Sequence, residues 1–187
     1  MSLNGTLERV GQALRRLGIE SPDPDREQVK FLVAELLNII PQGTYGTKLF
    51  NALARLTVTT AVEACCFRQT ETGPEVLLRQ RGPQETYPGQ FHCPGSVYRP
   101  GESDADLFAR LQRTEAMTDI RNPRLVGHNN HLTEERGHFV ALIFLVDAEA
   151  GPGTRWYSVM DLPEPILEQH RTKVIPTALE AFHRERT

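Results

Sequence analysis

The sequence predicts an α/β domain with a mixed β-sheet, preceded by a helical extension. Short β-branched and apolar runs, such as FVALIFLV at 139–146, are typical of strands buried on both faces. Between these runs, apolar residues recur every three or four positions, which is the spacing of amphipathic helices. Because strands and helices are interspersed along the chain, we expect one mixed-sheet domain of the α/β (α+β) class. A chain of 187 residues is long enough for one such domain with an added segment.

The first 56 residues are predicted to form three short helices. Helical spacing predicts the first helix at about 5–17. The second follows the SPDPDRE turn and ends by Pro41, and the third is predicted at about 49–56. Their apolar faces must be buried either against the domain's own sheet or against a second subunit, which would make a homodimer. The sequence leaves both arrangements open. We therefore divide the chain into a helical extension at 1–56 and a domain at 57–187.

The domain is predicted to continue as strands, turns and helices in a fixed order. The β-branched run VTTAVEACCF indicates the first strand, and the other elements follow from turn residues, capping residues and periodicity. A turn at 69–74 and a strand at 75–81 follow, then a loop at 82–90 and a short strand with turns at 91–103. Next we expect a helix at 105–117 capped by Ser103, the segment LVGHNNHL and a loop at 133–137. The domain ends with a strand at 138–146, a turn at 149–153, a strand around 155–159 and a helix at 173–183.

Composition and charge exclude several classes of function. With 21 basic and 24 acidic residues, the chain lacks the positive surplus that drives nucleic-acid binding, so we expect no nucleic-acid partner. We expect a cytoplasmic protein without a membrane partner, because no run approaches about 18 apolar residues and the start does not resemble a signal peptide. Three cysteines without a CxxC pair predict neither a disulfide framework nor a zinc site. The adjacent Cys65 and Cys66 are expected to be small core residues.

The stretch from 96 to 118 resembles the signature of the Nudix family, G-x5-E-x7-R-E-U-x-E-E-x-G-U, in which U is a bulky aliphatic residue. Glu102, Arg110 and Glu115 fall on its spacing. Other segments resemble the family in the same chain order: FHCPGS before the signature, LLRQR in the preceding strand, and RWYSVMDLPEPI further on. The resemblance covers roughly two thirds of the chain.

This resemblance implies a mixed sheet sandwiched between helices and a metal-dependent hydrolase. The implied substrate is a nucleoside diphosphate linked to another moiety, or a similar phosphorylated small molecule, and the implied cofactor is Mg²⁺ or Mn²⁺. Such hard cations prefer oxygen ligands. The carboxylate of Glu115, also a catalytic candidate, and the carbonyl of Gly95 would bind the metal. Glu102 and Arg110 would form the ion pair that organises the helix.

The chain departs from the signature at positions that matter for metal binding. Ser96 and Met117 replace its glycines, and Leu111 and Thr114 replace two of its glutamates, so that Glu115 alone remains of the metal-binding carboxylates on the helix. Free metal should therefore bind weakly unless substrate phosphates complete its coordination. The alternative is a Nudix fold that has lost hydrolysis and serves as a ligand-binding or protein-interaction module.

The helix at 107–115 also resembles that of the GDP-mannose mannosyl hydrolases, a Nudix branch with a similarly reduced signature. In that branch a later Gln-His pair supplies a further metal ligand and the general base. By this resemblance Asn130 is a candidate metal ligand and His131 the candidate general base, which its titration near neutral pH suits. Rival bases in the same segment are His128, Glu134 and Glu135.

Two arginines of LLRQR are candidates for substrate binding. Arg79 and Arg81 lie in the strand that leads into the loop at 82–90, and guanidinium groups match the geometry of phosphate. The alternative is an ordinary exposed strand face. His92 and His138 fall at or inside strand patterns, so we expect them to serve packing or hydrogen bonding.

Overall fold

The computed structural model describes residues 46–115, 117–134 and 136–186, together with isolated positions before them: Gln12, Arg15, Val29, Lys30, Val33, Ala34, Leu37 and Asn38. Contacts divide the chain into two compact units, Met1–Tyr45 and Gly46–Thr187. The isolated positions in the first unit are helical, and the rest of the two helices expected there lies outside the described residues. The two sheets, the helices that cover them and the candidate site all belong to the second unit.

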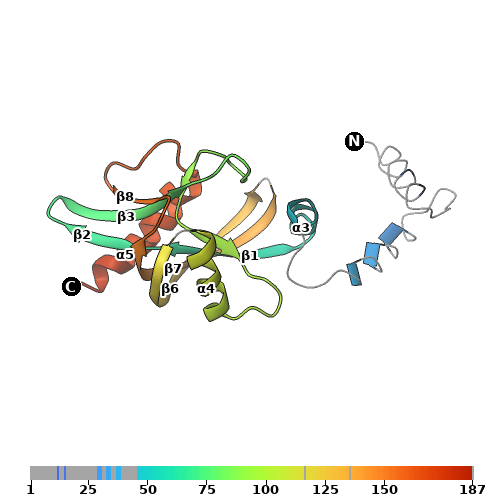
Figure 1. Cartoon of the computed structure of the whole chain (residues 1–187), viewed down its shortest axis with the longest axis horizontal. Helices are drawn as coiled ribbons and strands as arrows, with labels where there is room; N and C mark the ends of the chain where they lie inside the picture. Colours follow the sequence, from blue (N-terminus) through green and yellow to red (C-terminus); the bar gives the residue numbers. More distant parts are fainter. Residues whose placement is uncertain are drawn as a thin grey trace. The chain divides into compact units, whose positions relative to one another are not determined.

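The first of the two sheets that the described residues form is a mixed four-stranded sheet (Figure 1). Its order is β5 (Gly95–Val97), β1 (Val58–Cys65), β7 (Gly137–Ala150) and β6 (Met117–Glu134). The central pair, β1 and β7, runs parallel over eight residues of β1, whereas β5 and β6 pair antiparallel with their neighbours. The pairing of β1 with β7 thus joins two segments that lie far apart in the sequence.

A second sheet is built around β3 (Gly73–Gln80). Its first half pairs with β2 (Phe67–Thr70), and its end pairs with β4 (Phe91–His92). Strand β8 (Thr154–Ser158) pairs antiparallel with β3 along 75–79. Because β2 and β3 are joined by a tight turn at 71–72, the predicted turn at 69–74 is shorter in the structure, and the hairpin extends further.

Helices cover both faces of the central strands, as predicted. Phe144 and Val146 of β7 pack with Leu111 of α4 (Asp104–Thr114), and the alternate residues Ile143 and Leu145 pack with η1 (His170–Val174) and α5 (Ile175–Arg184). This two-sided burial follows from the two-residue period of a strand, and it accounts for the continuous apolar sequence of β7. The predicted mixed sheet between helices is therefore confirmed.

The helix predicted at 105–117 is shorter in the structure. Ser103 caps it as expected, with a capping box to Asp106, but α4 ends at Thr114 and β6 begins at Met117. Strand β6 was not predicted over 117–124, because its pairing with β7 shifts register repeatedly and positive φ angles occur at Asp119 and Asn122. These irregularities remove the alternation by which a strand is recognised.

The third predicted helix is α3 (Gly46–Ala54), which begins earlier than expected and packs on β7. The approach is close at Gly137, where a Cβ would lie 2.1 Å from the carbonyl oxygen of Ala54. A positive φ of 137° at Gly137 also favours glycine there. None of the helices described is long and apolar enough to cross a membrane.

Truncation of Leu111 tests whether this position serves the core. Leu111 is fully buried between α4 and the sheet. Leu111→Ala should lower the free energy of unfolding by about 2–5 kcal/mol, because it removes buried methyl groups and leaves a cavity. Leu111→Met, which conserves volume, should cost less than about 1.5 kcal/mol. Urea denaturation of both variants measures the difference, and equal losses would contradict the assignment.

Candidate functional site

A cavity of about 250 Å³ lies where the two sheets and η1 meet. Four of the residues singled out from the sequence line it: Arg81, Gly95, Glu115 and His131. Two carboxylates that were not singled out, Glu63 and Glu85, line it as well. The cavity thus gathers acidic and basic groups from strands, loops and the end of α4.

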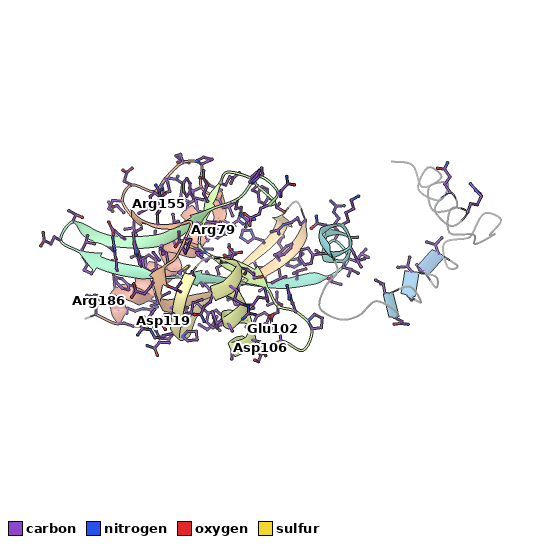
Figure 2. All side chains as sticks on the ribbon, in the orientation of Figure 1. Arg79, Glu102, Asp106, Asp119, Arg155 and Arg186 are labelled. Atoms are coloured by element: carbon purple, nitrogen blue, oxygen red, sulfur yellow. The ribbon has the colours of Figure 1, made fainter. Side chains whose placement is uncertain are left out.

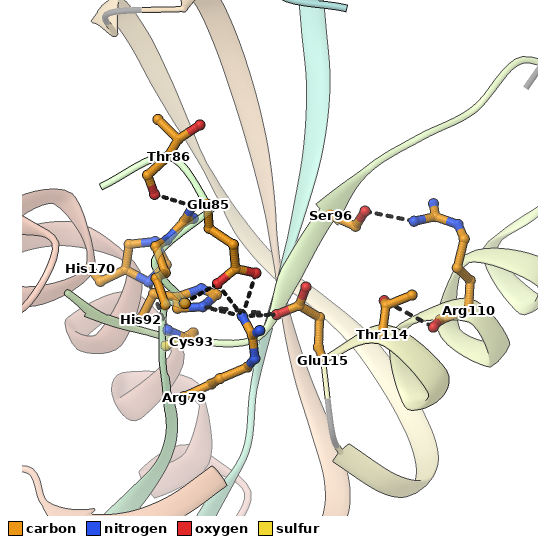
Figure 3. A network of polar contacts seen from close by, with 12 residues as sticks. Arg79, Glu85, Thr86, His92, Cys93, Ser96, Arg110, Thr114, Glu115 and His170 are labelled. Carbon is orange, nitrogen blue, oxygen red and sulfur yellow. Dashed lines mark hydrogen bonds and ion pairs between the residues drawn. The ribbon is translucent and has the colours of Figure 1, made fainter. Parts of the chain in front are cut away.

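Arg79 connects two of these carboxylates (Figure 3). Its Nη1 donates to both carboxylate oxygens of Glu85, at 2.9 and 3.0 Å, and to Oε2 of Glu115 at 3.4 Å. The side chains of Arg79 and Glu115 are only 19% and 13% exposed. His92 lies next to the pair, with Nε2 at 3.8 Å from Oε2 of Glu115. The structure therefore places a guanidinium directly against the predicted metal-binding carboxylate.

Glu115 stands just past the helix on which it was expected. It is the C-cap residue of α4, and its N–H donates to the carbonyl of Leu111 at 2.8 Å. Burial raises the pKa of Glu115 to about 7; Arg79 opposes this rise and the nearby Glu85 adds to it. A carboxyl with this pKa can both hold and release a proton near neutral pH.

Glu85 is fixed by its own loop as well as by Arg79. The N–H of Gly82 donates to its Oε2 at 2.5 Å, and its own N–H donates to the carbonyl of Gly82 at 3.1 Å. Burial acts to raise the pKa of Glu85, but the hydrogen bonds from Arg79 and Gly82 outweigh it and lower the pKa. Glu85 therefore carries a negative charge at neutral pH and holds Arg79 in place.

Glu63 reaches the cavity from the middle of β1. It pairs with Gly95 of β5, and a Cβ at position 95 would lie 2.5 Å from Oε2 of Glu63 and 2.6 Å from the carbonyl oxygen of Val62. Only glycine leaves room for this carboxylate. Burial raises the pKa of Glu63 to about 8, against the lowering effect of Arg81.

His170 lies behind Glu63 and is 1% exposed. Its Nδ1 accepts a hydrogen bond from the N–H of Cys93 at 3.0 Å, and its Nε2 lies 3.7 Å from Oε2 of Glu63. Because Nδ1 accepts, Nε2 carries the proton of the neutral ring. Burial lowers the pKa of His170 to about 3, so the ring stays neutral and presents an N–H toward the carboxylate.

Glu102 and Arg110 form a compact ion pair beside the N-terminal end of α4, where Figure 2 labels Glu102. Arg110 donates to both oxygens of Glu102 at 2.7 Å, to Oγ of Ser96 at 2.6 Å and to the carbonyl of Val97 at 2.9 Å. Ser96 thus takes part in the support of the loop where the signature has glycine. The pair ties α4 to β5 and does not line the cavity.

The structure separates the residues expected from the later segment. His131 lines the cavity, and its Nε2 is hydrogen-bonded to Nδ2 of Asn129. Asn130 points to the other side of β6, where its Oδ1 lies 2.6 Å from Nε2 of His138, since adjacent strand residues face opposite ways. His128 shares that side and is exposed. Glu135 lies outside the described residues, as does the side chain of Glu134.

Arg81 faces the cavity from the end of the second sheet. Its Nη1 donates to the carbonyl of Thr86 at 2.9 Å, while Nε is buried and has no hydrogen-bond partner among the described residues. Burial lowers the pKa of its guanidinium, and Glu63 partly offsets this effect. A buried guanidinium with a donor to spare is suited to an anionic ligand.

The cavity fits a divalent cation by the chemistry of its donors but not by their present arrangement. Glu63, Glu85 and Glu115 offer the oxygen ligands that Mg²⁺ and Mn²⁺ prefer, and glycine at 95 makes room for the carboxylate of Glu63. Within the described part of the chain, however, no three His, Cys, Asp or Glu side chains group closely enough to hold a metal. Oxygens from a ligand would have to complete such a site.

Sequence reasoning did not identify Glu63, Glu85 or His170. For Glu63 a signal existed, since it interrupts the apolar run AVEACCF as a single charged residue. Glu85 stands in a polar loop and His170 before a helix, where such residues are ordinary. Their meeting in one cavity depends on long-range strand pairing, which no local pattern reveals.

No protein-family model matches the sequence, and no curated protein matches it significantly. Solved structures match its fold. A MutT NUDIX hydrolase from Burkholderia pseudomallei shares 18% identity at a TM-score of 0.51, over 62% of this chain and 94% of that chain. A MutT/nudix family protein from Enterococcus faecalis shares 15% at 0.55, over 83% and 69%. The NUDIX domain of Shewanella oneidensis NrtR, solved with ADP ribose, shares 18% at 0.54, over 81% and 97%.

At identities of 15% to 18%, these likenesses establish the architecture. The chain therefore has the Nudix fold, as its signature-like segment predicted. What the cavity of this chain binds has to be argued from its own residues.

The pH dependence of stability tests the burial of Glu63. Its raised pKa means that the folded chain binds this proton more tightly than the unfolded chain does. The resulting stabilisation is present below pH 4.5 and is lost as the pH rises through about 8, at about 1.4 kcal/mol for each pKa unit. Glu63→Gln should therefore lose less stability than the wild type between about pH 6 and about pH 9 in urea denaturation.

The exposed Glu71→Gln is the matched control, because it removes one carboxylate without touching the cavity. It should follow the wild-type pH dependence. If Glu63→Gln and Glu71→Gln show the same pH dependence, Glu63 is not buried as the structure indicates.

Proposed function

We propose that this protein is a Nudix-type hydrolase that acts on a phosphorylated small molecule in the cavity, with a nucleoside diphosphate linked to another moiety as the substrate class. The observation that carries the proposal is the meeting of Arg81, whose buried Nε has no hydrogen-bond partner among the described residues, with the carboxylates of Glu85 and Glu115 in one cavity. A guanidinium can bind a phosphate, and carboxylate oxygens can hold a divalent cation that helps water to attack.

The solved structures support the nucleotide part of this proposal. One neighbour in fold, the NUDIX domain of NrtR, was solved in complex with ADP ribose. ADP ribose is a diphosphate that links a nucleoside to a second sugar, which is the kind of molecule that the sequence resemblance implies. We therefore use it as the first ligand in the experiments below.

The cofactor we propose is Mg²⁺ or Mn²⁺. Glu115, together with the carbonyl of Gly95, would hold it, and oxygens of the ligand's phosphates would complete its coordination. A bound divalent cation neutralises phosphate oxygens and helps water to attack. Asn130 remains a predicted ligand from the sequence, but its side chain is bonded to His138 on the outer side of β6.

The remaining candidate residues, in and around the cavity, have proposed roles that follow from their positions. Arg79 and Arg81 bind the phosphates, and the pair formed by Glu102 and Arg110 holds the loop before α4 in place. His131 is the proposed general base, because it lines the cavity, whereas His128, the other candidate whose side chain the structure describes, does not. Its hydrogen bond to Asn129 fixes the orientation of the ring.

A second function is favoured by the contact between Arg79 and Glu115. If the guanidinium stays on this carboxylate when a ligand binds, the cavity recognises a phosphorylated molecule without hydrolysing it. The protein would then be a ligand-binding or protein-interaction module with a Nudix fold. The fully buried Leu111, where the signature has glutamate, points in the same direction.

Three expectations about the protein's setting stay predictions: a cytoplasmic location, the absence of a nucleic-acid partner, and a homodimer as one of the two arrangements for the helical extension. The three cysteines are free and buried, which suits a reducing compartment. The fold neighbours do not decide the question of nucleic acid.

A substrate panel tests the proposed hydrolysis. Purified protein is incubated with ADP ribose, other nucleoside diphosphate-sugars, dinucleotides and nucleoside triphosphates, each with Mg²⁺ or Mn²⁺, and the products are separated by chromatography. We expect turnover of at least one nucleoside diphosphate derivative, reduced at least tenfold in Glu115→Gln, since a tenfold loss corresponds to about 1.4 kcal/mol of barrier.

Glu71→Gln is again the control and should keep the wild-type rate. Ligand-induced thermal stabilisation without product from any member of the panel would favour the binding module. Turnover that Glu115→Gln leaves unchanged would contradict the proposed site.

A further inference from the structure

The contact of Arg79 with Glu115 bears on how this cavity acquires a cation. Arg79 is the last residue but one of β3, in register with His92 of β4, and its guanidinium contacts Glu85 and Glu115, two carboxylates that line the cavity. One nitrogen, Nη1, serves Glu85 at 2.9 and 3.0 Å and Glu115 at 3.4 Å. The contact with Glu115 is the longer and therefore the weaker one. It is the contact that a competing anion displaces first.

A phosphate is such a competitor. Guanidinium groups bind phosphate through two parallel hydrogen bonds, and Arg79 has further N–H donors beyond Nη1. Glu85 is anchored by the N–H of Gly82, so it can keep Arg79 near the cavity while the guanidinium turns. Glu115 has no comparable anchor for its carboxylate among the hydrogen bonds described; Nε2 of His92 lies 3.8 Å away, but burial lowers the pKa of His92 well below its usual value, so this ring is neutral.

We propose that Arg79 makes cation binding at Glu115 conditional on a phosphorylated ligand: the guanidinium that neutralises Glu115 moves to the ligand's phosphate, and the freed carboxylate then binds the divalent cation together with that phosphate. This inference rests on the proposed function, because it takes the ligand and the cation from it. It adds that the two bind cooperatively and that Arg79 is the residue that couples them.

The charges of the cavity give the physical reason for this coupling. A cation alone meets the positive charge of Arg79 at Glu115. A phosphate alone brings negative charge toward Glu85, which is ionised at neutral pH, and toward Glu115, and both line the same cavity. When both are bound, the phosphate pairs with Arg79 and the cation with Glu115, so each relieves the repulsion that the other meets. Such coupling must be reciprocal between the two ligands.

The test is the affinity for Mn²⁺, read from the electron paramagnetic resonance of the free ion. Wild type should bind Mn²⁺ weakly without a ligand, and Arg79→Gln should bind it about tenfold more tightly, within the usual range of coupling between two sites. Arg155→Gln is the matched control: Arg155, labelled in Figure 2, is an exposed arginine of the neighbouring strand β8. It should bind Mn²⁺ as the wild type does.

A second titration adds saturating ADP ribose, with the affinity of ADP ribose itself for Mn²⁺ measured separately and subtracted. The ligand should tighten Mn²⁺ binding by wild type and by Arg155→Gln about tenfold. In Arg79→Gln the gain should be much smaller, because Glu115 is already free. If Arg79→Gln does not fold, Arg79→Lys replaces it, since an ammonium lacks the planar fork and should hold Glu115 less well.

Equal Mn²⁺ affinity of wild type and Arg79→Gln, or an equal gain on addition of ADP ribose, would overturn the coupling. Tighter binding by Arg155→Gln as well would show a general effect of charge and would also overturn it. Neither readout depends on turnover. A protein that shows the coupling but hydrolyses nothing refutes the proposed hydrolase alone, and a hydrolase without the coupling refutes this inference alone.

Discussion

The parallel ladder between β1 and β7 is the constraint on which the rest of the structure depends. It pairs Val58 with His138 at one end and Cys65 with Leu145 at the other. This register decides which residues of each strand face α4 and which face η1, α5 and the cavity. A slip by one residue would move Glu63 from the cavity into the apolar layer under α4 and would expose the core residues of β1 to the cavity. Both the core and the site therefore follow from one alignment.

Several buried ionisable side chains of both signs surround the cavity. Glu63 and Glu115 have raised pKa values because they are buried, whereas Glu85 is kept ionised by Arg79 and Gly82. Isolated buried charges are costly, so each carboxylate needs a partner. Arg79 of β3 and Arg81, which directly follows β3, supply the positive charge. The signature-like segment of this chain lacks two of the signature's glutamates. Arg79 contacts the remaining metal-ligand candidate on that segment, Glu115, which a metal was expected to neutralise.

Sequence predicted the class of fold well, because the features involved are local. The apolar period of β7, the cap at Ser103 and the run of β1 each lie within a few residues, and the structure confirms the elements they predicted. The end of α4 and the whole first half of β6 were not predicted correctly, since bulges and positive φ angles break the pattern there. Glu115 and Gly95, which the family resemblance named, both line the cavity, and their roles stay predictions. Glu63 and His170 could not be named, because they meet only through tertiary contacts.

We propose that phosphorylated ligand and divalent cation meet at Glu115 while Arg79 changes partner. A crystal structure with ADP ribose and Mn²⁺, with diffraction measured at the manganese absorption edge, would locate all three groups at once. We expect an anomalous peak at the carboxylate of Glu115, with the guanidinium of Arg79 on a phosphate of the ligand. A bound ligand with Arg79 still paired to Glu115 and no anomalous peak there would contradict it.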